Sequence, residues 1–312
     1  MQNISDNFRR SFVFQKQIMM RRVVYSLLPI MIFSLYLYGL RSLMIHAVVF
    51  IAGTLTEYFF MKARGKKVSE AVLVTSALYA LSMPPMVPLW VAAIGIIFGV
   101  LFGKCIFGGF GRNIFNPAIT GRLFVYITFP SFMTTGWMTP GNFGMNQADA
   151  VSTATPLGLM RAGTNPELMD LLTGIRAGSL GESAVILIIL AAIYLIYTKT
   201  ASWRIILSTA VSFTALSSIL FFMGVPASFP PMEALFSGSV LFVIVFMATD
   251  PVTGPKKNQA QYLYGILIGS VTCLVRVFSL FPEGTSFGIL MGNTFASLFD
   301  EWFTPKKKGA GK

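Results

Sequence analysis

The sequence predicts an all-α, polytopic membrane protein with about ten transmembrane helices. Hydrophobic residues make up 54% of the 312 residues and charged residues only 12%, whereas about a quarter of the residues of an ordinary soluble domain are charged. The mean hydropathy is +0.70 over the whole length, which excludes a cytosolic globule with one apolar core. At about 20 residues per spanning helix, this length leaves no room for a separate soluble catalytic domain.

Ten apolar stretches have roughly the length of a spanning helix. The third ends at Pro84-Pro85 and the eighth at Asp250-Pro251. Proline interrupts a helix, and irregular backbone within a membrane must be covered by protein, so these two stretches are predicted to be broken helices inside the protein. The predicted spans are 22–40, 42–62, 69–84, 88–104, 115–132, 183–199, 203–224, 231–249, 260–281 and 285–303.

The lysines and arginines predict the orientation of these spans. With residues 1–21 in the cytoplasm, most of the 24 basic residues fall in inside segments, as the positive-inside rule expects. Both termini are then cytoplasmic, the basic tail 305–312 is a topological anchor, and the long connection 133–182 lies outside. Loops of this length are uncommon and often functional.

Two groups of five spans, 22–132 and 183–304, resemble an internal repeat. Each has an apolar run, a Pro-containing break and a Gly-containing helix, and Asn116 and Asn293 occupy similar positions in the final span of each group. Because five is odd, the two halves would be inverted relative to each other. Inverted repeats with broken helices usually hold a site near the middle of the membrane.

The rare residues restrict the possible cofactors. Two cysteines, Cys105 and Cys273, and one histidine, His46, cannot build an Fe–S cluster, a zinc site or a bis-His haem site within this chain alone. A redox cofactor would therefore be organic or shared with a partner. The net charge of +12 is spread through short loops, so we expect no nucleic-acid partner and treat both cysteines as buried apolar residues.

Four acidic residues lie in or beside the predicted spans. A charge in the middle of a bilayer costs about 2.5–3.5 kcal/mol on insertion scales, so Glu57 and Asp300 are candidates for a cation-uptake site. The alternative is that they are interfacial or pair with buried arginines, which we favour for Glu70 and Asp250.

Arg122 and Arg276 fall within spans and need an internal anion, either a carboxylate or a ligand phosphate. Asp300 is a candidate partner for one of them. The Gly-rich segment 107–113 is a weak phosphate-loop signal, because it lacks the Lys-Ser/Thr of a nucleotide loop and has no preceding strand. Tight backbone packing at a helix break is the favoured interpretation.

Over nearly the whole chain, a set of motifs resembles one family of membrane redox proteins. The family contains RnfD of the Rnf ion-translocating electron-transfer complex and NqrB of the sodium-pumping NADH:quinone reductase. The set is specific, although each motif alone is weak. The motifs are Val74-Thr75-Ser76, Pro84-Pro85, Pro88-Leu89-Trp90, Phe107-Gly108-Gly109, Gly111-Arg112-Asn113, Asn116-Pro117-Ala118, Gly121-Arg122, Ala201-Ser202-Trp203-Arg204, Met247-Ala248-Thr249-Asp250-Pro251-Val252, Tyr264-Gly265 and Pro282-Glu283-Gly284.

The resemblance implies a covalent flavin. In the family, an outer-loop motif close to Asp-Gly-x-Ser-Gly-Ala-Thr carries FMN through a phosphoester on its final threonine, which corresponds to Thr155 here. We also expect Asp149, Ser152 and Arg122 to contribute to this site. The chain has Ala150 and Thr153 where glycines are common, and Thr153 is an out-of-register acceptor.

The resemblance also implies ions, partners and a location. Glu57 and Asp300 match membrane acids that the quinone-reductase branch uses in sodium uptake, and the family holds a second flavin, riboflavin, noncovalently. Other subunits, including a second FMN-carrying subunit and Fe–S subunits, would supply electrons in a prokaryotic cell membrane, and a flavin transferase would attach the FMN. The chain alone has no complete active site and no Rossmann fold for NADH.

The function we expect is electron transfer through FMN on Thr155, coupled to Na⁺ or H⁺ movement, in an Rnf-type complex. Only about 20 residues precede the first span, a short N-terminal segment that favours this branch, as does the sequence around Thr155. NqrB of the quinone reductase is the alternative within the family. A secondary transporter or channel is the alternative from another class, because inverted five-helix repeats are also a transporter plan.

Overall fold

The computed structural model describes residues 14–138, 140–141, 143, 154–164, 166–279 and 284–304. These residues fold mainly as α-helices, as predicted from the sequence. In this part of the chain the only β-type pairing is an isolated bridge between Gln15 and Ser69. The predicted basic tail 305–312 and most of segment 1–21 lie outside the described residues.

The first half contains one long bent helix and several shorter ones. Helix α2 covers both of the first two predicted spans and bends at Gly39, whose φ of 58° and ψ of −140° are not helical. Helix α4 continues into a π-helical turn, η1. The elements of this half are α2 (Ile18–Ala63), α3 (Ala71–Leu81), α4 (Leu89–Val100), η1 (Leu101–Cys105), α5 (Pro117–Thr128) and α6 (Pro130–Thr134).

The second half follows a connection that carries two short helices. The predicted eighth span is divided into three pieces, with a break at Ser237–Ser239. The elements are α7 (Pro156–Arg161), α8 (Leu168–Thr173), α9 (Val185–Tyr197), α10 (Trp203–Phe222), α11 (Pro231–Phe236), α12 (Val240–Phe242), η3 (Val243–Met247), α13 (Asn258–Phe278) and α14 (Thr285–Trp302).

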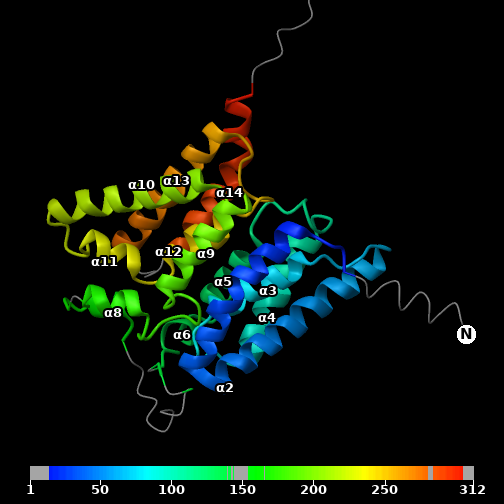
Figure 1. Ribbon diagram of the computed structural model, residues 1–312, viewed down its shortest axis with the longest axis horizontal. Coiled ribbons are helices and arrows are strands. Elements are labelled where there is room, and N and C mark those ends of the chain that lie inside the picture. The colour runs from blue at the N-terminus through cyan, green and yellow to red at the C-terminus, as the bar shows by residue number, and fades with distance from the viewer. Residues whose placement is uncertain are drawn as a thin grey trace, which may run out of the picture.

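The helices form two groups that lie side by side (Figure 1). In the first group α2 packs on α3 and α4, and α4 packs on α5; in the second, α10 packs on α13 and α13 on α14. Contacts of α2 with α9 and of α5 with α14 join the groups. Both predicted broken helices are present, since α3 ends at Leu81, before Pro84-Pro85, and η3 ends at Met247.

Glycines allow close helix packing in both groups. A side chain at Gly121 of α5 would lie 2.4 Å from the backbone oxygen of Gly95 in α4, and a side chain at Gly269 of α13 would lie 2.5 Å from the backbone oxygen of Thr209 in α10. Small residues of this kind are typical of helix interfaces in membranes, where hydrophobic burial against lipid supplies little driving force.

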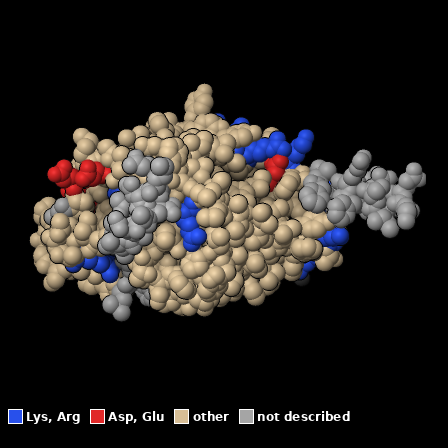
Figure 2. Space-filling view, turned by 90° about the horizontal axis from the view of Figure 1, so that it is seen from below, with Lys and Arg blue, Asp and Glu red and all other residues tan. Residues whose placement is uncertain are grey.

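Three helices, α2, α10 and α13, are long and apolar enough to span a membrane by length and composition, and α3, α4 with η1, and α9 are shorter apolar helices. Large apolar side chains are exposed along them, such as Ile32, Phe59 and Val211. Figure 2 shows a face with few charged residues. These observations fit a membrane protein, whereas the count of ten spans and their inverted repeat stay predictions.

Candidate functional site

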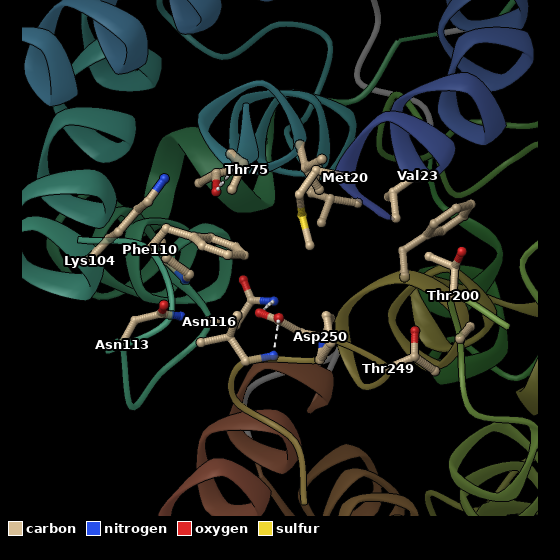
Figure 3. Close-up of a pocket in the computed structure, with 18 of the residues that line it drawn as sticks. Met20, Val23, Thr75, Lys104, Phe110, Asn113, Asn116, Thr200, Thr249 and Asp250 are labelled. Carbon is tan, nitrogen blue, oxygen red and sulfur yellow. Dashed lines mark hydrogen bonds between the residues drawn. The ribbon is translucent and has the colours of Figure 1, made fainter. Parts of the chain in front are cut away.

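A cavity lies between the two helix groups, and we call it the central cavity. The first group contributes side chains of α2, α3 and the segment before α5, and the second contributes the end of α9 and the break after η3 (Figure 3). Its polar lining is concentrated at interrupted helices. The polar and charged residues are Thr75, Lys104, Asn113, Asn116, Thr200, Thr249 and Asp250.

Asn116 connects the start of α5 to the opposite half. Its side-chain Oδ1 accepts the backbone N–H of Ala118 at 3.0 Å and so caps α5, which then begins with Pro117, a favoured first residue of a helix. Its Nδ2 donates to Asp250 Oδ2 at 3.4 Å, and its backbone N–H donates to Asn293 Oδ1 at 3.1 Å. One residue of the first half therefore bonds to two residues of the second.

Asn293 and Asp250 extend this polar network. Asn293 Nδ2 donates to the hydroxyl of Tyr264 at 2.8 Å, and Asp250 Oδ1 accepts the backbone N–H of Val252 at 2.9 Å. Asn293 and Tyr264 are buried, so these bonds satisfy polar groups that water cannot reach. The sequence pointed to Asn116, Asp250 and Asn293 separately, and the structure brings them together.

Glu57 lies in a second polar cluster, with Ser69 and Lys104. Glu57 and Lys104 are each only 1% exposed. Lys104 Nζ lies 2.7 Å from Glu57 Oε2 and donates to Ser69 Oγ at 2.7 Å, while Ser69 donates to Glu57 Oε1 through both its hydroxyl and its backbone N–H. A buried pair keeps its charges only when such hydrogen bonds compensate for lost hydration.

The partners of Glu57 were not found from the sequence. We considered Arg122 or Arg276 as its alternative partner, whereas the structure gives Lys104. Lys104 ends an apolar stretch and was counted there as an orientation signal. Only its place in the π-helical turn η1, two residues after exposed Phe102, directs it inward.

Asp300 has a different environment from Glu57. It is partly exposed near the end of α14, and its carboxylate accepts the backbone N–H groups of Lys256 and Lys257 at 2.9–3.1 Å, just before α13. Among the described residues it forms no ion pair with a buried arginine, so the expected pairing is wrong. The Nη1 of Arg276 instead donates to the backbone carbonyls of Ala234 and Ser237.

Glu70 is bound at the connection between α2 and α3. Its carboxylate accepts the Nε of Arg21 at 2.9 Å and the backbone N–H of Gln17 at 2.6 Å. The Arg21 guanidinium holds the pKa of Glu70 below its usual value. The expected pairing of Glu70 with an arginine holds, but the partner is Arg21 and not Arg122 or Arg276.

The Gly-rich segment 107–113 packs tightly, as the favoured interpretation expected. Gly108 and Gly109 have φ values of 110° and 99°, which side-chain-bearing residues rarely adopt. The carbonyl of Gly108 accepts the side chain of Lys66, and a side chain at Gly109 would lie 3.2 Å from Met61. The segment thereby turns back onto the end of α2.

Thr155 begins the short helix α7. It is partly exposed, and its hydroxyl oxygen accepts the backbone N–H of Gly158 at 3.1 Å, as an N-cap does. Leu157 and Met160 of α7 are buried in an apolar cluster with residues of α10, α12 and α13. Asp149 and Ser152 lie outside the described residues.

Helix α7 also contacts both halves through Arg161. The Nη2 of Arg161 donates to the backbone carbonyl of Arg276 at 3.0 Å. Arg161 also interacts electrostatically with Tyr126 of α5, one turn beyond Arg122. Arg122 itself is buried in α5. The residue expected to carry the flavin therefore starts a helix that is fixed to the helical core.

Cys105 and Cys273 are both buried and unpaired, in agreement with their interpretation as apolar residues. Among the described residues, no group of three or more His, Cys, Asp or Glu side chains lies close enough to hold a metal ion.

Comparison with known proteins identifies the family. A model of the NQR2, RnfD, RnfE family matches residues 11–309. The chain belongs to this family. The resemblance found in the sequence motifs is thereby confirmed, and with it the membership of a group of membrane subunits of redox complexes.

Curated relatives in the NQR2, RnfD, RnfE family carry a more specific name, that of NqrB of the Na(+)-translocating NADH-quinone reductase. The relative from Chromohalobacter salexigens is 40% identical over 266 residues, which cover 83% of this chain and 64% of the relative. The protein of the same name from Azotobacter vinelandii is 38% identical over 272 residues, covering 83% of this chain and 66% of the relative. The chain thus spans about two thirds of the length of these relatives.

Proposed function

We propose that this chain is a membrane subunit of a complex that couples electron transfer to the movement of Na⁺ or H⁺. The observation that carries the ion-transport part is the pair of buried polar clusters at interrupted helices, Glu57–Ser69–Lys104 and Asn116–Asp250–Asn293. Ionisable groups inside a membrane protein are costly, and they mark ion pathways more often than structural sites. The names of the relatives favour Na⁺ as the ion.

The electron-carrying part of the proposal rests on Thr155. Its hydroxyl is partly exposed and makes one described hydrogen bond, as acceptor from Gly158, so the residue fits an attachment site for FMN. The apolar anchoring of α7 would keep an attached group beside the second helix group. When bound, FMN would supply one- and two-electron redox chemistry that no side chain of this protein offers.

The proposal is made for the activity that both branches of the family share. The short N-terminal segment and the sequence around Thr155 favour an Rnf-type protein, whereas the relatives reported above favour NqrB of the quinone reductase. In either branch the partners would be other membrane subunits, a second FMN-carrying subunit and Fe–S subunits. A noncovalent riboflavin is part of the proposal, without residues assigned to it.

The flavin proposal is tested by intact mass and in-gel flavin fluorescence of the denatured chain, produced together with its flavin transferase. We expect the wild-type band to fluoresce and to carry one FMN minus water. Thr155→Ala should lose both signals, because the phosphoester oxygen is removed. Thr153→Ala is the matched control and should keep them; loss in Thr153→Ala alone would move the attachment site.

The same measurement separates this function from its rival. A secondary transporter with inverted repeats would be colourless and would move its substrate alone in liposomes. A colourless wild-type band in the presence of an active transferase would contradict the flavin proposal and favour the transporter.

A further inference from the structure

The Glu57–Ser69–Lys104 cluster lies between two cavities. Lys104 lines the central cavity. Glu57 and Ser69 line a second cavity, which we call the basic cavity because Lys66, Lys67 and Arg112 also line it. Phe110 belongs to the lining of both. The charged pair is therefore part of the wall that separates the two spaces.

The carboxylate of Glu57 is already occupied by a cation. Oε2 accepts the Lys104 ammonium at 2.7 Å, and Oε1 accepts the Ser69 hydroxyl at 2.7 Å and the Ser69 backbone N–H at 3.0 Å. An ammonium and an alkali cation carry the same charge and both bind oxygen atoms. A cation arriving from the basic cavity would therefore compete with Lys104 for the same carboxylate.

The backbone around Lys104 is also unusual. Lys104 lies in η1, a five-residue π-helical turn that continues α4. Such turns are rare and frequently occur at functional sites. The nearby apolar residues Phe102 and Ile106 are 47% and 48% exposed, whereas Lys104 is 1% exposed, so the turn brings one lysine into the interior of an otherwise apolar segment.

The central cavity offers a second acidic group to the ammonium. In Figure 3, Lys104 lies at one side of the cavity and points away from Asp250, which lies across it together with Asn116. An ammonium that left Glu57 would not be stranded among apolar groups, which would be costly, because the same cavity contains the Asp250 carboxylate.

We propose that Lys104 is the resident counter-cation of Glu57, and that the transported alkali cation binds Glu57 only when the Lys104 ammonium leaves it. Lys104 then acts as a positioning residue that sets the affinity of the cation site and keeps the two cavities separate while the site holds no transported ion. This inference rests on the proposed function in cation translocation.

The test uses the assembled complex and measures electron-transfer turnover as a function of Na⁺ concentration. Lys104→Gln removes the competing charge, and we expect the half-saturating Na⁺ concentration to fall about tenfold, which corresponds to about 1.4 kcal/mol of binding free energy. Lys104→Arg keeps the charge and adds a planar, bidentate grip on the carboxylate. We therefore expect this variant to raise the half-saturating concentration.

Opposite shifts in the two variants are the signature of competition. Lys104→Gln leaves a buried carboxylate without a counter-charge, which destabilises a fold, so Lys104→Arg alone decides if that variant does not assemble. An unchanged or lowered half-saturating concentration in Lys104→Arg overturns the inference. Retained in-gel flavin fluorescence shows that each variant complex keeps its cofactor.

A control separates competition from a general loss of positive charge. Lys66 lines the basic cavity and its Nζ donates to the carbonyl of Gly108. Lys66→Gln should shift the half-saturating concentration much less than Lys104→Gln, and an equal shift overturns the inference. A wild-type complex whose turnover does not respond to Na⁺ contradicts the proposed function itself, whereas a responsive wild type with unshifted Lys104 variants contradicts only the role of Lys104.

Discussion

At the scale of single residues, the environment of each membrane acid decides what it can do. Glu57 and Asp300 are equivalent by hydropathy, yet Glu57 is 1% exposed and bound to Lys104, while Asp300 is partly exposed and accepts main-chain N–H groups. Removing charge from Glu57 therefore disturbs a compensated buried pair. Removing it from Asp300 disturbs the start of α13.

The Arg21–Glu70 contact predicts a pH-dependent stability. A carboxyl group whose pKa is lower in the folded state stabilises that state at pH values above its unfolded pKa, about 4.5, and the stabilisation is lost as the pH falls through the lower folded value. Glu70→Gln should therefore lower the thermal unfolding midpoint of the detergent-solubilised protein at pH 7. The difference from wild type should shrink below pH 4.5.

Glu233→Gln is the control for the Glu70 prediction. Glu233 lies in the first turn of α11, and no salt bridge to it occurs among the described residues. We expect its thermal midpoint to stay close to wild type at both pH values. A Glu70→Gln midpoint that differs from wild type by the same amount at pH 7 and at pH 4 would show that the ion pair does not contribute.

The sequence identified the acids but not their partners. Glu57 and Lys104 are 47 residues apart, and hydropathy treats a lysine at the end of a span as interfacial. The inward direction of Lys104 depends on the π-helical turn, which has no composition signal. Thr155 was found through a motif, and its role as an N-cap of α7 follows from Pro156 only once the helix is seen.

At the scale of elements, hydropathy located the helices better than it located their ends. All ten predicted stretches overlap helices, and the interruptions at Pro84-Pro85 and Asp250-Pro251 were predicted from proline. The bend of α2 at Gly39 and the break at Gly238, where φ is 63°, were not. A glycine inside an apolar run does not reveal whether its φ is positive, since that depends on packing.

The contact between α4 and α5 predicts a strong effect for a small substitution. In Gly121→Ala the new methyl group would lie 2.4 Å from the carbonyl oxygen of Gly95, so the helices must move apart. Overpacking of this kind costs about 1–3 kcal/mol, and we expect a lower thermal midpoint in detergent. Ile127→Ala in the same helix is the control, because Ile127 is 60% exposed and surface substitutions stay within about 0.5 kcal/mol.

Equal midpoints for the α5 variants Gly121→Ala and Ile127→Ala would contradict close packing of α4 on α5. Equivalent close contacts of α13 with α10, at Gly265 and Gly269, predict the same sensitivity in the second half. The two halves would then share a packing rule even where their helix lengths differ.

At the scale of the whole molecule, polar contacts join two helix groups that each have their own apolar contacts. Helix α7 contacts both groups through Arg161, and Asn116 bonds to Asp250 and Asn293 across the central cavity. Joining the halves through a few polar groups leaves the interface easier to rearrange than a packed apolar core. Coupling an ion to a redox change needs an element with two such arrangements.

Asn293 tests whether this network holds the halves together. Asn293→Ala removes the acceptor of the Asn116 N–H and the donor to the Tyr264 hydroxyl. Each buried group left without a partner costs about 1–3 kcal/mol, so we expect a clear fall in the thermal midpoint. Thr294→Ala is the control, because this exposed hydroxyl bonds only to Leu290 within α14. If both variants melt alike, the halves are held by apolar contacts and not by the network around the central cavity.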